Sequence, residues 1–373
     1  MREKCAITGR ADLELLYSFP DFPVFMGCVE QPYVLDIYQD MTWLISKSSG
    51  LIQLKKLVPL EVLYSETHGA GGVGGLWQKH HTDFAKFVNK ANPKAVLEIG
   101  GAHGILEKNY HKYGQIPWTI IEPNPVPVEG CKATFIKDFF DENFTYDNKF
   151  DTVVHSHVFE HIYCPDDFMK HLSHFMSSGK KLVFSLPNMQ AMLERKYTNC
   201  IMFEHTVFLT EFYIEYILAR HGFEILNKEY FMNDHSIFFS AIRKPSATPI
   251  SLQQGLYDKN RKIYMNYINY HKNLISELNH KMNQTSKPIF LFGAHIFAQT
   301  LLAFGLDTDK IICLLDNDSN KHGRRLYGTK LKVASPKILA EESNPIVILK
   351  AGAYSNEIKY DILSNINQNT EFI

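Results

Sequence analysis

The sequence contains no apolar run that approaches about 18 residues, the length at which a helix spans a bilayer. Its first residues, MREKCAITGR, lack the apolar core of a signal peptide. Cysteine is also scarce: six cysteines lie scattered along 373 residues, which is typical of thiols in a reducing compartment rather than of a disulfide framework. We therefore expect a cytoplasmic protein without a membrane partner.

An excess of charge of either sign is missing too. The sequence has 39 Lys and Arg against 40 Asp and Glu, a net charge of -1, and no basic cluster. This balance favours neither nucleic acid nor an anionic membrane as a partner. What the sequence does have is 45% hydrophobic residues, in a length that suggests two or three domains. We expect a soluble globular protein with no nucleic-acid partner.

The most informative segment is 96–104 (VLEIGGAHG), an apolar run followed by an acid and a glycine-rich turn. A buried parallel strand that ends in a tight turn has this pattern. Gly100 and Gly104 lack a Cβ, so the backbone can turn sharply and a ligand can lie against it. The E-x-G-x-x-x-G spacing is not the G-x-G-x-x-G of dinucleotide sites, and no P-loop lysine follows. An ordinary strand–turn–helix junction is the alternative to a cofactor site here.

From residue 94 onward, strand and helix patterns alternate, which predicts a doubly wound parallel sheet. The second strand ends at Glu122, about 20 residues after the glycine turn, where a carboxylate can accept hydrogen bonds from ribose hydroxyls. Asp138 follows the third strand beside two phenylalanines, where a carboxylate and aromatic edges can meet an adenine ring. The predicted strands are 95–99, 118–121, 134–136, 150–155 and 182–185, with helices at 76–89 and 212–221 and an antiparallel pair at 224–230 and 236–242.

Residues 1–65 consist of short, irregular segments, and a module of this kind often needs a staple such as a Cys₄ zinc site. Only Cys5 occupies one of the four presumed ligand positions. The other three are hydroxyls, which bind zinc poorly, so we expect no metal there. These three residues are Thr8, Ser46 and Ser49.

Before the predicted sheet, a glycine-rich segment at 65–75 is either a linker or a lid near the active site. A Pro/Ser linker at 244–251 leads to a long helical pattern at 256–282. A second α/β unit follows, with a strand–glycine–helix–strand–acid order but no catalytic set. For this unit we expect a substrate-holding or structural role. Its predicted strands are 288–292, 311–315 and 346–350, with a helix at 296–304.

The order of these features in residues 94–243 resembles class I S-adenosylmethionine-dependent methyltransferases. The segment 155–161 (HSHVFEH) is similar to the V-L-E-H segment that follows the fourth strand in that fold. The resemblance implies a Rossmann-like α/β domain that binds S-adenosyl-L-methionine. The cofactor-binding residues that it implies are Glu98, Gly100, Gly101, Gly104, Glu122, Asp138 and His155.

A narrower resemblance covers nearly the whole chain. The degraded zinc knuckles, FEH at 203–205, LDND at 315–318 and KHGR at 321–324 make the chain similar to the three-part sugar C-methyltransferases of deoxysugar biosynthesis. This implies methyl transfer to a nucleotide-linked sugar or a related carbohydrate. It also implies three domains: a small N-terminal module at 1–65, a methyltransferase domain at 66–246 and a C-terminal α/β domain at 247–373.

Two departures from that family bear on the reaction. The family carries Tyr-His-Glu-His where this chain has Met-Phe-Glu-His at 202–205, and His-Gly-Gly-Ser where it has Asn-Asp-His-Ser at 233–236. Oxygen therefore stays open as an alternative to carbon as the methyl acceptor. An O- or N-methyltransferase of another small molecule, or a methyltransferase-like binding protein without turnover, also stays open. An NAD-dependent dehydrogenase is disfavoured by the glycine spacing.

Methylation of a carbon beside a ketone requires a base to remove a proton and a means to stabilise the enolate. Histidine suits the first task because its pKa lies near neutrality. The catalytic candidates are His205 as the base and Glu204, which would orient it or hold a sugar hydroxyl. Seventeen histidines make chance clusters easy, so we rank His157, His161 and His235 below His205. Lys321 and Arg324 are either diphosphate ligands or solvated loop charges.

Overall fold

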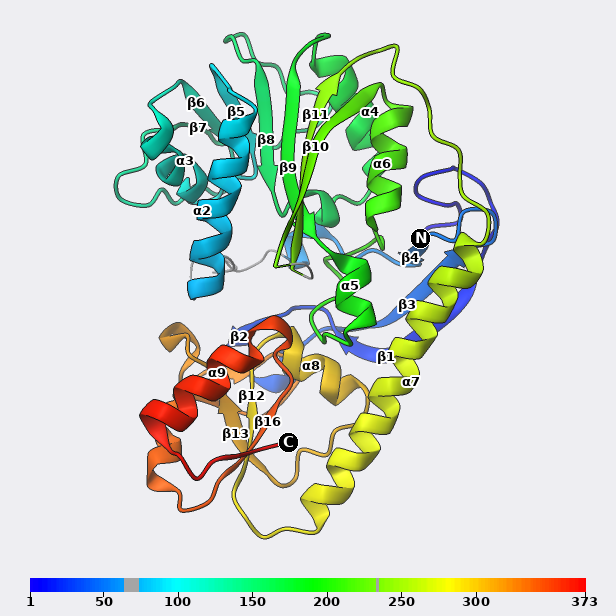
Figure 1. Cartoon of the computed structure of the whole chain (residues 1–373). Helices are drawn as coiled ribbons and strands as arrows, with labels where there is room; N and C mark the ends of the chain where they lie inside the picture. The colour runs from blue at the N-terminus through cyan, green and yellow to red at the C-terminus, as the bar shows by residue number, and fades with distance from the viewer. Residues whose placement is uncertain (64–73, 233–234) are drawn as a thin grey trace.

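The computed structural model describes residues 1–63, 74–232 and 235–373, and Figure 1 shows two α/β regions joined by a long helix, with N-terminal strands between them. The segment at 65–75 that we predict to be a linker or a lid lies outside the described residues, apart from its last two glycines. In the described part of the chain, no helix is both long enough and apolar enough to cross a membrane.

The central region is built around a seven-stranded sheet with the order β10-β11-β9-β8-β5-β6-β7. The strands from β5 to β9 pair in parallel, and β10 and β11 close the sheet with antiparallel pairs. The predicted Rossmann-like α/β fold is therefore confirmed. The strands are β5 (Val96–Ile99), β6 (Trp118–Ile121), β7 (Thr134–Ile136), β8 (Thr152–Ser156), β9 (Lys181–Pro187), β10 (Phe223–Phe231) and β11 (Ser236–Arg243).

Helices cover both faces of this sheet (Figure 1). Successive side chains of a strand point to opposite faces, so Val96 and Val154 pack into a cluster with Phe84 of α2. Their neighbours Leu97 and Val153 pack into a second cluster with residues of α4 and α6. The helices of this region are α2 (Gly75–Lys90), α3 (Ile105–Tyr110), α4 (Pro165–Phe175), α5 (Met189–Glu194) and α6 (Glu211–Arg220).

The N-terminal region forms a three-stranded antiparallel sheet of β1 (Leu13–Pro23), β3 (Tyr38–Ser46) and β4 (Ile52–Leu54), followed by the short helix α1 (Leu60–Leu63). Its buried residues belong to one hydrophobic cluster with residues of the central region, so the domain boundaries stay a prediction. The sequence analysis missed the eleven-residue length of β1, because prolines argue against a strand. A register shift between Phe19 and Phe22 accommodates Pro20, and Pro23 is the last residue of the strand.

The N-terminal region also joins the C-terminal region directly. The strand β2 (Cys28–Val29) pairs with β14 (Arg325–Leu326) in a two-stranded sheet. Beside this pair, both guanidinium Nη atoms of Arg325 donate to the carboxylate of Asp36, each at 2.6 Å. A bidentate pair of this kind fixes the relative position of both groups.

The C-terminal region is a second parallel sheet, which follows the long helix α7 (Leu256–Asn283) and has the order β15-β13-β12-β16-β17. This confirms that a second α/β unit follows the first. Its remaining elements are β12 (Ile289–Phe292), α8 (Ile296–Ala303), β13 (Ile311–Leu315), β15 (Val333–Ala334), β16 (Ile346–Leu349), α9 (Ser355–Asp361) and β17 (Glu371–Phe372).

Candidate active site

The glycine turn connects β5 to α3 at the carboxyl end of the parallel strands. Gly100 and Gly104 have φ angles of +69° and +70°, which side-chain-bearing residues rarely adopt. A Cβ on Gly100 would lie 2.7 Å from the side chain of Val158, and one on Gly104 would lie 2.3 Å from the Sγ atom of Cys131. Both positions therefore require glycine, and the turn presents backbone rather than side chains at this edge of the sheet.

The carboxylate of Glu98 lies beneath this turn. Glu98 is buried, and the indole N–H of Trp118 donates to its Oε2 atom at 2.7 Å. Burial raises the pKa of Glu98 to about 7, against the opposing effect of the Trp118 hydrogen bond. A Cβ on Gly101 would lie 2.9 Å from Oε1 of Glu98, so the turn closes directly over the acid. The buried Glu98 carboxylate thus packs against the backbone of the turn at Gly101.

Glu122 and Asp138 follow the next two strands, so the sheet order brings both to the same edge as the glycine turn. The Glu122 carboxylate accepts hydrogen bonds from the backbone N–H groups of Ala102 and Asn124, both at 3.1 Å. It is half-buried and retains lone pairs for further donors. Asp138 is exposed and accepts from the N–H of Phe139 at 2.8 Å. Their roles toward a cofactor stay predictions.

His155 is placed differently from the other predicted cofactor residues. It is fully buried, and its ring stacks on that of Phe184 with centroids 4.8 Å apart. Neither ring nitrogen has a hydrogen-bond partner among the described residues. Burial lowers the pKa of His155 to about 3, so the ring is neutral. The structure therefore buries this side chain in the core, and its role toward a cofactor stays a prediction.

A second group of polar side chains surrounds His205. Its Nδ1–H donates to the carbonyl oxygen of Cys200 at 3.1 Å, which leaves Nε2 as the acceptor. The ring centroid of His161 lies 5.3 Å away, and the Nδ1 atom of His161 lies 3.5 Å from Oε2 of Glu204. Burial lowers the pKa of His205 to about 4, so its imidazole is neutral at neutral pH. It is available as a proton acceptor, but it is a weaker base than an exposed histidine.

The N-terminal region holds the loop that carries these residues. Arg2 donates to the carbonyl oxygen of Thr206 at 2.6 Å and to its hydroxyl at 3.0 Å. The same guanidinium donates to the carbonyl oxygen of Tyr163, two residues after His161. Nothing local in the sequence distinguishes Arg2 from any other charged residue, so its position could not be predicted. Its role depends on contacts across some two hundred positions.

Histidine and aromatic rings form a third group near the start of α2. The hydroxyl of Ser236 lies 3.0 Å from Nε2 of His157 and 2.7 Å from Nδ1 of His235. The Trp77 ring packs edge-on against both histidines. Its centroid lies 4.9 Å from that of His157 and 5.2 Å from that of His235. The ring of Tyr354, in the C-terminal region, packs edge-on against that of His235, with the ring centroids 6.4 Å apart. The C-terminal region thus reaches this side of the central sheet, and Trp77 is a residue that the sequence analysis did not assign to the site.

The two cations that we considered as diphosphate ligands already have acidic neighbours. The Lys321 ammonium lies 2.9 Å from Oδ2 of Asp316. The Arg324 Nε atom lies 3.4 Å from Oε1 of Glu30. A diphosphate would therefore compete with carboxylates for both groups.

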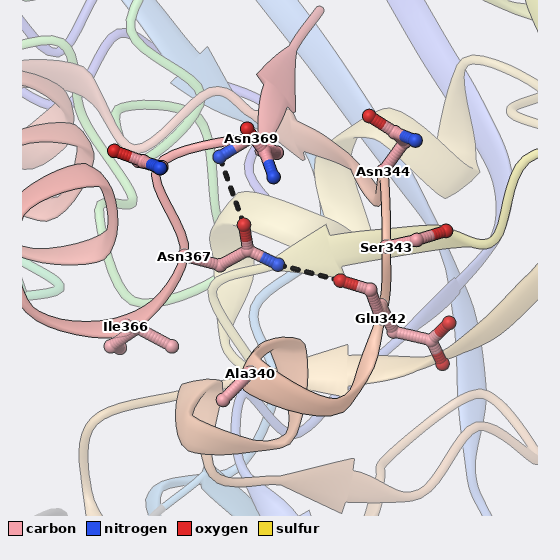
Figure 2. Close-up of a pocket in the computed structure, with 8 residues that line it drawn as sticks. Ala340, Glu342, Ser343, Asn344, Ile366, Asn367 and Asn369 are labelled. Atoms are coloured by element: carbon pink, nitrogen blue, oxygen red, sulfur yellow. Dashed lines mark hydrogen bonds between the residues drawn. The ribbon is translucent and has the colours of Figure 1, made fainter.

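The C-terminal region has an open surface pocket of about 550 Å³. Figure 2 shows residues that line it. An amide hydrogen bond from Asn367 to the carbonyl oxygen of Glu342 spans it at 2.8 Å. None of the predicted site residues lines this cavity, so we assign it no part in the chemistry. Its lining comprises Ala340, Glu342, Ser343, Asn344, Ile366, Asn367, Gln368 and Asn369.

Two family models match separate parts of the chain. Residues 75–228 match the family model described as a methyltransferase domain, and residues 254–373 match the one described as a C-methyltransferase C-terminal domain. No curated protein matches the sequence.

Among solved structures, magnesium protoporphyrin IX methyltransferase from Synechocystis with bound SAH is similar over 47% of this chain and 90% of its own, at 18% identity and a TM-score of 0.36. The N-methyltransferase NodS from Bradyrhizobium japonicum in complex with SAH has the same coverage and TM-score at 15% identity. At these scores the likeness carries no argument about function.

Proposed function

The protein is an S-adenosylmethionine-dependent methyltransferase, and from this premise we propose that it methylates a carbon atom of a nucleotide-linked sugar or a related carbohydrate. The match of residues 254–373 to a C-methyltransferase C-terminal domain supports carbon as the acceptor. The likeness of the chain to three-part sugar C-methyltransferases supports a sugar.

The residues at the strand ends fit the cofactor. The glycine turn offers a backbone surface that a Cβ at Gly100 or Gly104 would disturb. Glu122, which follows the strand next to the edge strand β7, would accept hydrogen bonds from both ribose hydroxyls, and Asp138 would lie beside the adenine ring. When bound, S-adenosylmethionine supplies an electrophilic methyl group on a positively charged sulfur.

His205 is proposed as the base, and the observation that carries this is its hydrogen bond to Cys200, which directs the proton to Nδ1 and leaves Nε2 basic. Nε2 would take the proton from a substrate carbon beside a ketone. The electron pair of the broken C–H bond would form the enolate. Its carbon would take the methyl group that the cofactor supplies, as the methyl–sulfur bond breaks and its electron pair stays on sulfur. Glu204 would orient a substrate hydroxyl or the neighbouring His161, whose Nδ1 lies 3.5 Å away.

An oxygen acceptor is the second candidate, and one observation favours it. Met202 and Phe203, which precede Glu204, are buried and apolar, so neither offers a proton donor that would stabilise an enolate beside His205. Transfer to a hydroxyl needs the same base without that stabilisation. The two candidates therefore differ in the product and agree on the base.

The test is a panel of nucleotide-linked sugars, half bearing a ketone and half only hydroxyls, incubated with the purified protein and S-adenosylmethionine and read by product mass. The proposal expects a mass gain of one methyl group with keto sugars. Loss of turnover is expected in His205→Ala and not in His174→Ala, which removes an exposed histidine of α4. Undiminished turnover in His205→Ala would refute the assignment of the base, and no turnover on any sugar would refute the substrate class.

A further inference from the structure

Glu160, His161 and His205 bring three metal-binding side chains together. One ligand atom from each lies within 4.8 Å of the others. The first two residues belong to the 3-10 helix η3 (Phe159–His161) that follows β8, and the third comes from the loop that precedes α6. The tertiary fold, and not a local sequence motif, therefore assembles the group.

The carboxylate of Glu160 is the unusual member. Glu160 is only 1% exposed, and neither carboxylate oxygen has a hydrogen-bond partner among the described residues. The Nδ1 atom of His157 lies 3.1 Å from Oε1, without the geometry of a hydrogen bond, and Nε2 of His161 lies 3.9 Å from the same oxygen. A buried carboxylate is unfavourable unless its charge is paired or coordinates a metal. A buried polar group without partners therefore points to a missing ligand such as an ion.

Each of the two histidines has an acceptor at its other ring nitrogen. Nδ1 of His205 donates to the Cys200 carbonyl at 3.1 Å, and Nδ1 of His161 lies 3.5 Å from the Glu204 carboxylate. Metal-binding histidines are commonly oriented in this way, because an acceptor at one nitrogen fixes the tautomer and directs the lone pair of the other toward the metal. For His161, that other nitrogen is the one that faces Glu160.

We infer that Glu160, His161 and His205 form a binding site for one divalent transition-metal ion, with Zn²⁺ the best match. Two imidazoles and a carboxylate are a recurrent Zn²⁺ ligand set with an open fourth position, whereas Mg²⁺ prefers oxygen ligands alone. Bonds of about 2.0–2.2 Å place tetrahedral ligand atoms roughly 3.3–3.6 Å apart. The three side chains therefore close by about an ångström around the ion, a movement that side-chain rotations provide.

The site goes beyond the proposed function and has a consequence for it. The Nε2 atom of His205 cannot hold a metal ion and accept a proton at the same time. Binding of the ion and base catalysis by His205 therefore exclude each other, and added Zn²⁺ lowers methyl transfer as it fills the site. The open fourth position is available to water or to a substrate oxygen.

The experiment measures metal binding without substrate, so its outcome is independent of the proposed reaction. Protein stripped with a chelator is titrated with ZnCl₂ by calorimetry, and with CoCl₂ by visible absorption. We expect one equivalent to bind, and a Co²⁺ spectrum without the sulfur charge-transfer bands that binding to the free cysteines would produce. We expect Glu160→Gln and His161→Asn each to weaken binding by at least about 10- to 100-fold. The control Glu194→Gln removes an exposed carboxylate of α5 and leaves binding unchanged.

Two results would overturn the inference: no binding by the wild-type protein, or equal binding by Glu160→Gln and His161→Asn. Circular dichroism of the metal-free variants checks that each one folds. If one does not, Glu204→Gln takes its place, because it disturbs the orientation of His161 without removing a ligand. That variant is expected to weaken Zn²⁺ binding, and unchanged affinity in it would also count against the site.

Discussion

Arg2 donates to the carbonyl oxygen of Thr206 at 2.6 Å, and thereby connects the first residues of the chain to the residue that follows His205. A β-bridge between Gln53 of β4 and Val207 connects another part of the N-terminal region to the same loop. Burial lowers the pKa of Arg2 to about 10, so the guanidinium stays charged at neutral pH. An N-terminal region that lacks three of its four presumed zinc ligands thus still holds the loop of the proposed base in place.

Replacing Arg2 tests this positioning role. Arg2→Met keeps the apolar stem but removes the hydrogen bonds, and a misplaced base is expected to lower kcat by about 10- to 100-fold. The affinity for S-adenosylmethionine should not change, because the glycine turn lies on another part of the sheet edge. Steady-state kinetics and calorimetry separate the two effects, with the exposed Arg10→Met as the control. Equal loss of both quantities would indicate general unfolding instead.

Removing the Glu122 carboxylate tests the cofactor site. Hydrogen bonds to a charged group contribute about 1.5–3 kcal/mol each, so the loss of two in Glu122→Ala should weaken S-adenosylmethionine binding by about 100-fold or more. Exposed Glu129→Ala serves as the matched control. Calorimetry measures both affinities, and thermal melting shows whether the variant folds. An unchanged Kd in a folded Glu122→Ala protein would show that the ribose assignment is wrong.

Gly104→Ala separates steric collision from backbone strain. Its added Cβ would meet the Cys131 Sγ at 2.3 Å, whereas a Cβ on Gly130, also at positive φ, would meet nothing closer than 3.7 Å. Strain at positive φ costs of order 1–3 kcal/mol, so both variants should be destabilised and Gly104→Ala should lose more. Urea denaturation gives the free energies of unfolding. Adding Cys131→Ala to Gly104→Ala should restore part of the lost free energy of unfolding. If it restores none, the collision with Cys131 is not the cause of the extra loss.

The Asp36–Arg325 pair predicts how stability depends on pH. Burial alone would raise the pKa of Asp36, but hydrogen bonds from Arg325 and the N–H of Gly328 outweigh it and lower that pKa. The stabilisation is therefore complete above the unfolded-state pKa of about 3.9 and disappears as the pH falls through the lower folded-state value. Asp36→Asn leaves Arg325 without its counter-charge and should cost about 3–5 kcal/mol at neutral pH.

Urea denaturation of both proteins at neutral and at acidic pH checks this. The difference in unfolding free energy between wild type and Asp36→Asn should shrink in acid. A constant difference across that range would show that the pair contributes nothing through the charge of Asp36.

The sequence predicts the elements of the central sheet well because periodicity is a local property. The strand from Trp118 to Ile121 and the strand from Thr134 to Ile136 have the bounds that the pattern indicates. His155 could have been placed by the same rule, because it shares a strand face with Val153, which packs toward α4. That alternation predicts a buried side chain, as the structure shows.

Contacts between distant segments were beyond such reasoning. The Arg2–Thr206 hydrogen bonds and the Asp36–Arg325 pair depend on how three regions pack together. No spacing rule connects residues so far apart in the chain. The group of Glu160, His161 and His205 shows the same limit. The first two lie in a segment that the sequence analysis singled out, but only the fold brings the third beside them.

The position of the transferred methyl group tests the central claim most directly. S-adenosylmethionine carrying a ¹³C-methyl group is incubated with a nucleotide-linked keto sugar that the panel identifies as a substrate, and the product is examined by NMR. We predict a methyl carbon bonded to a ring carbon with wild-type protein and no labelled product with His205→Ala. A labelled methoxy group, or undiminished C-methylation by His205→Ala, would contradict the account.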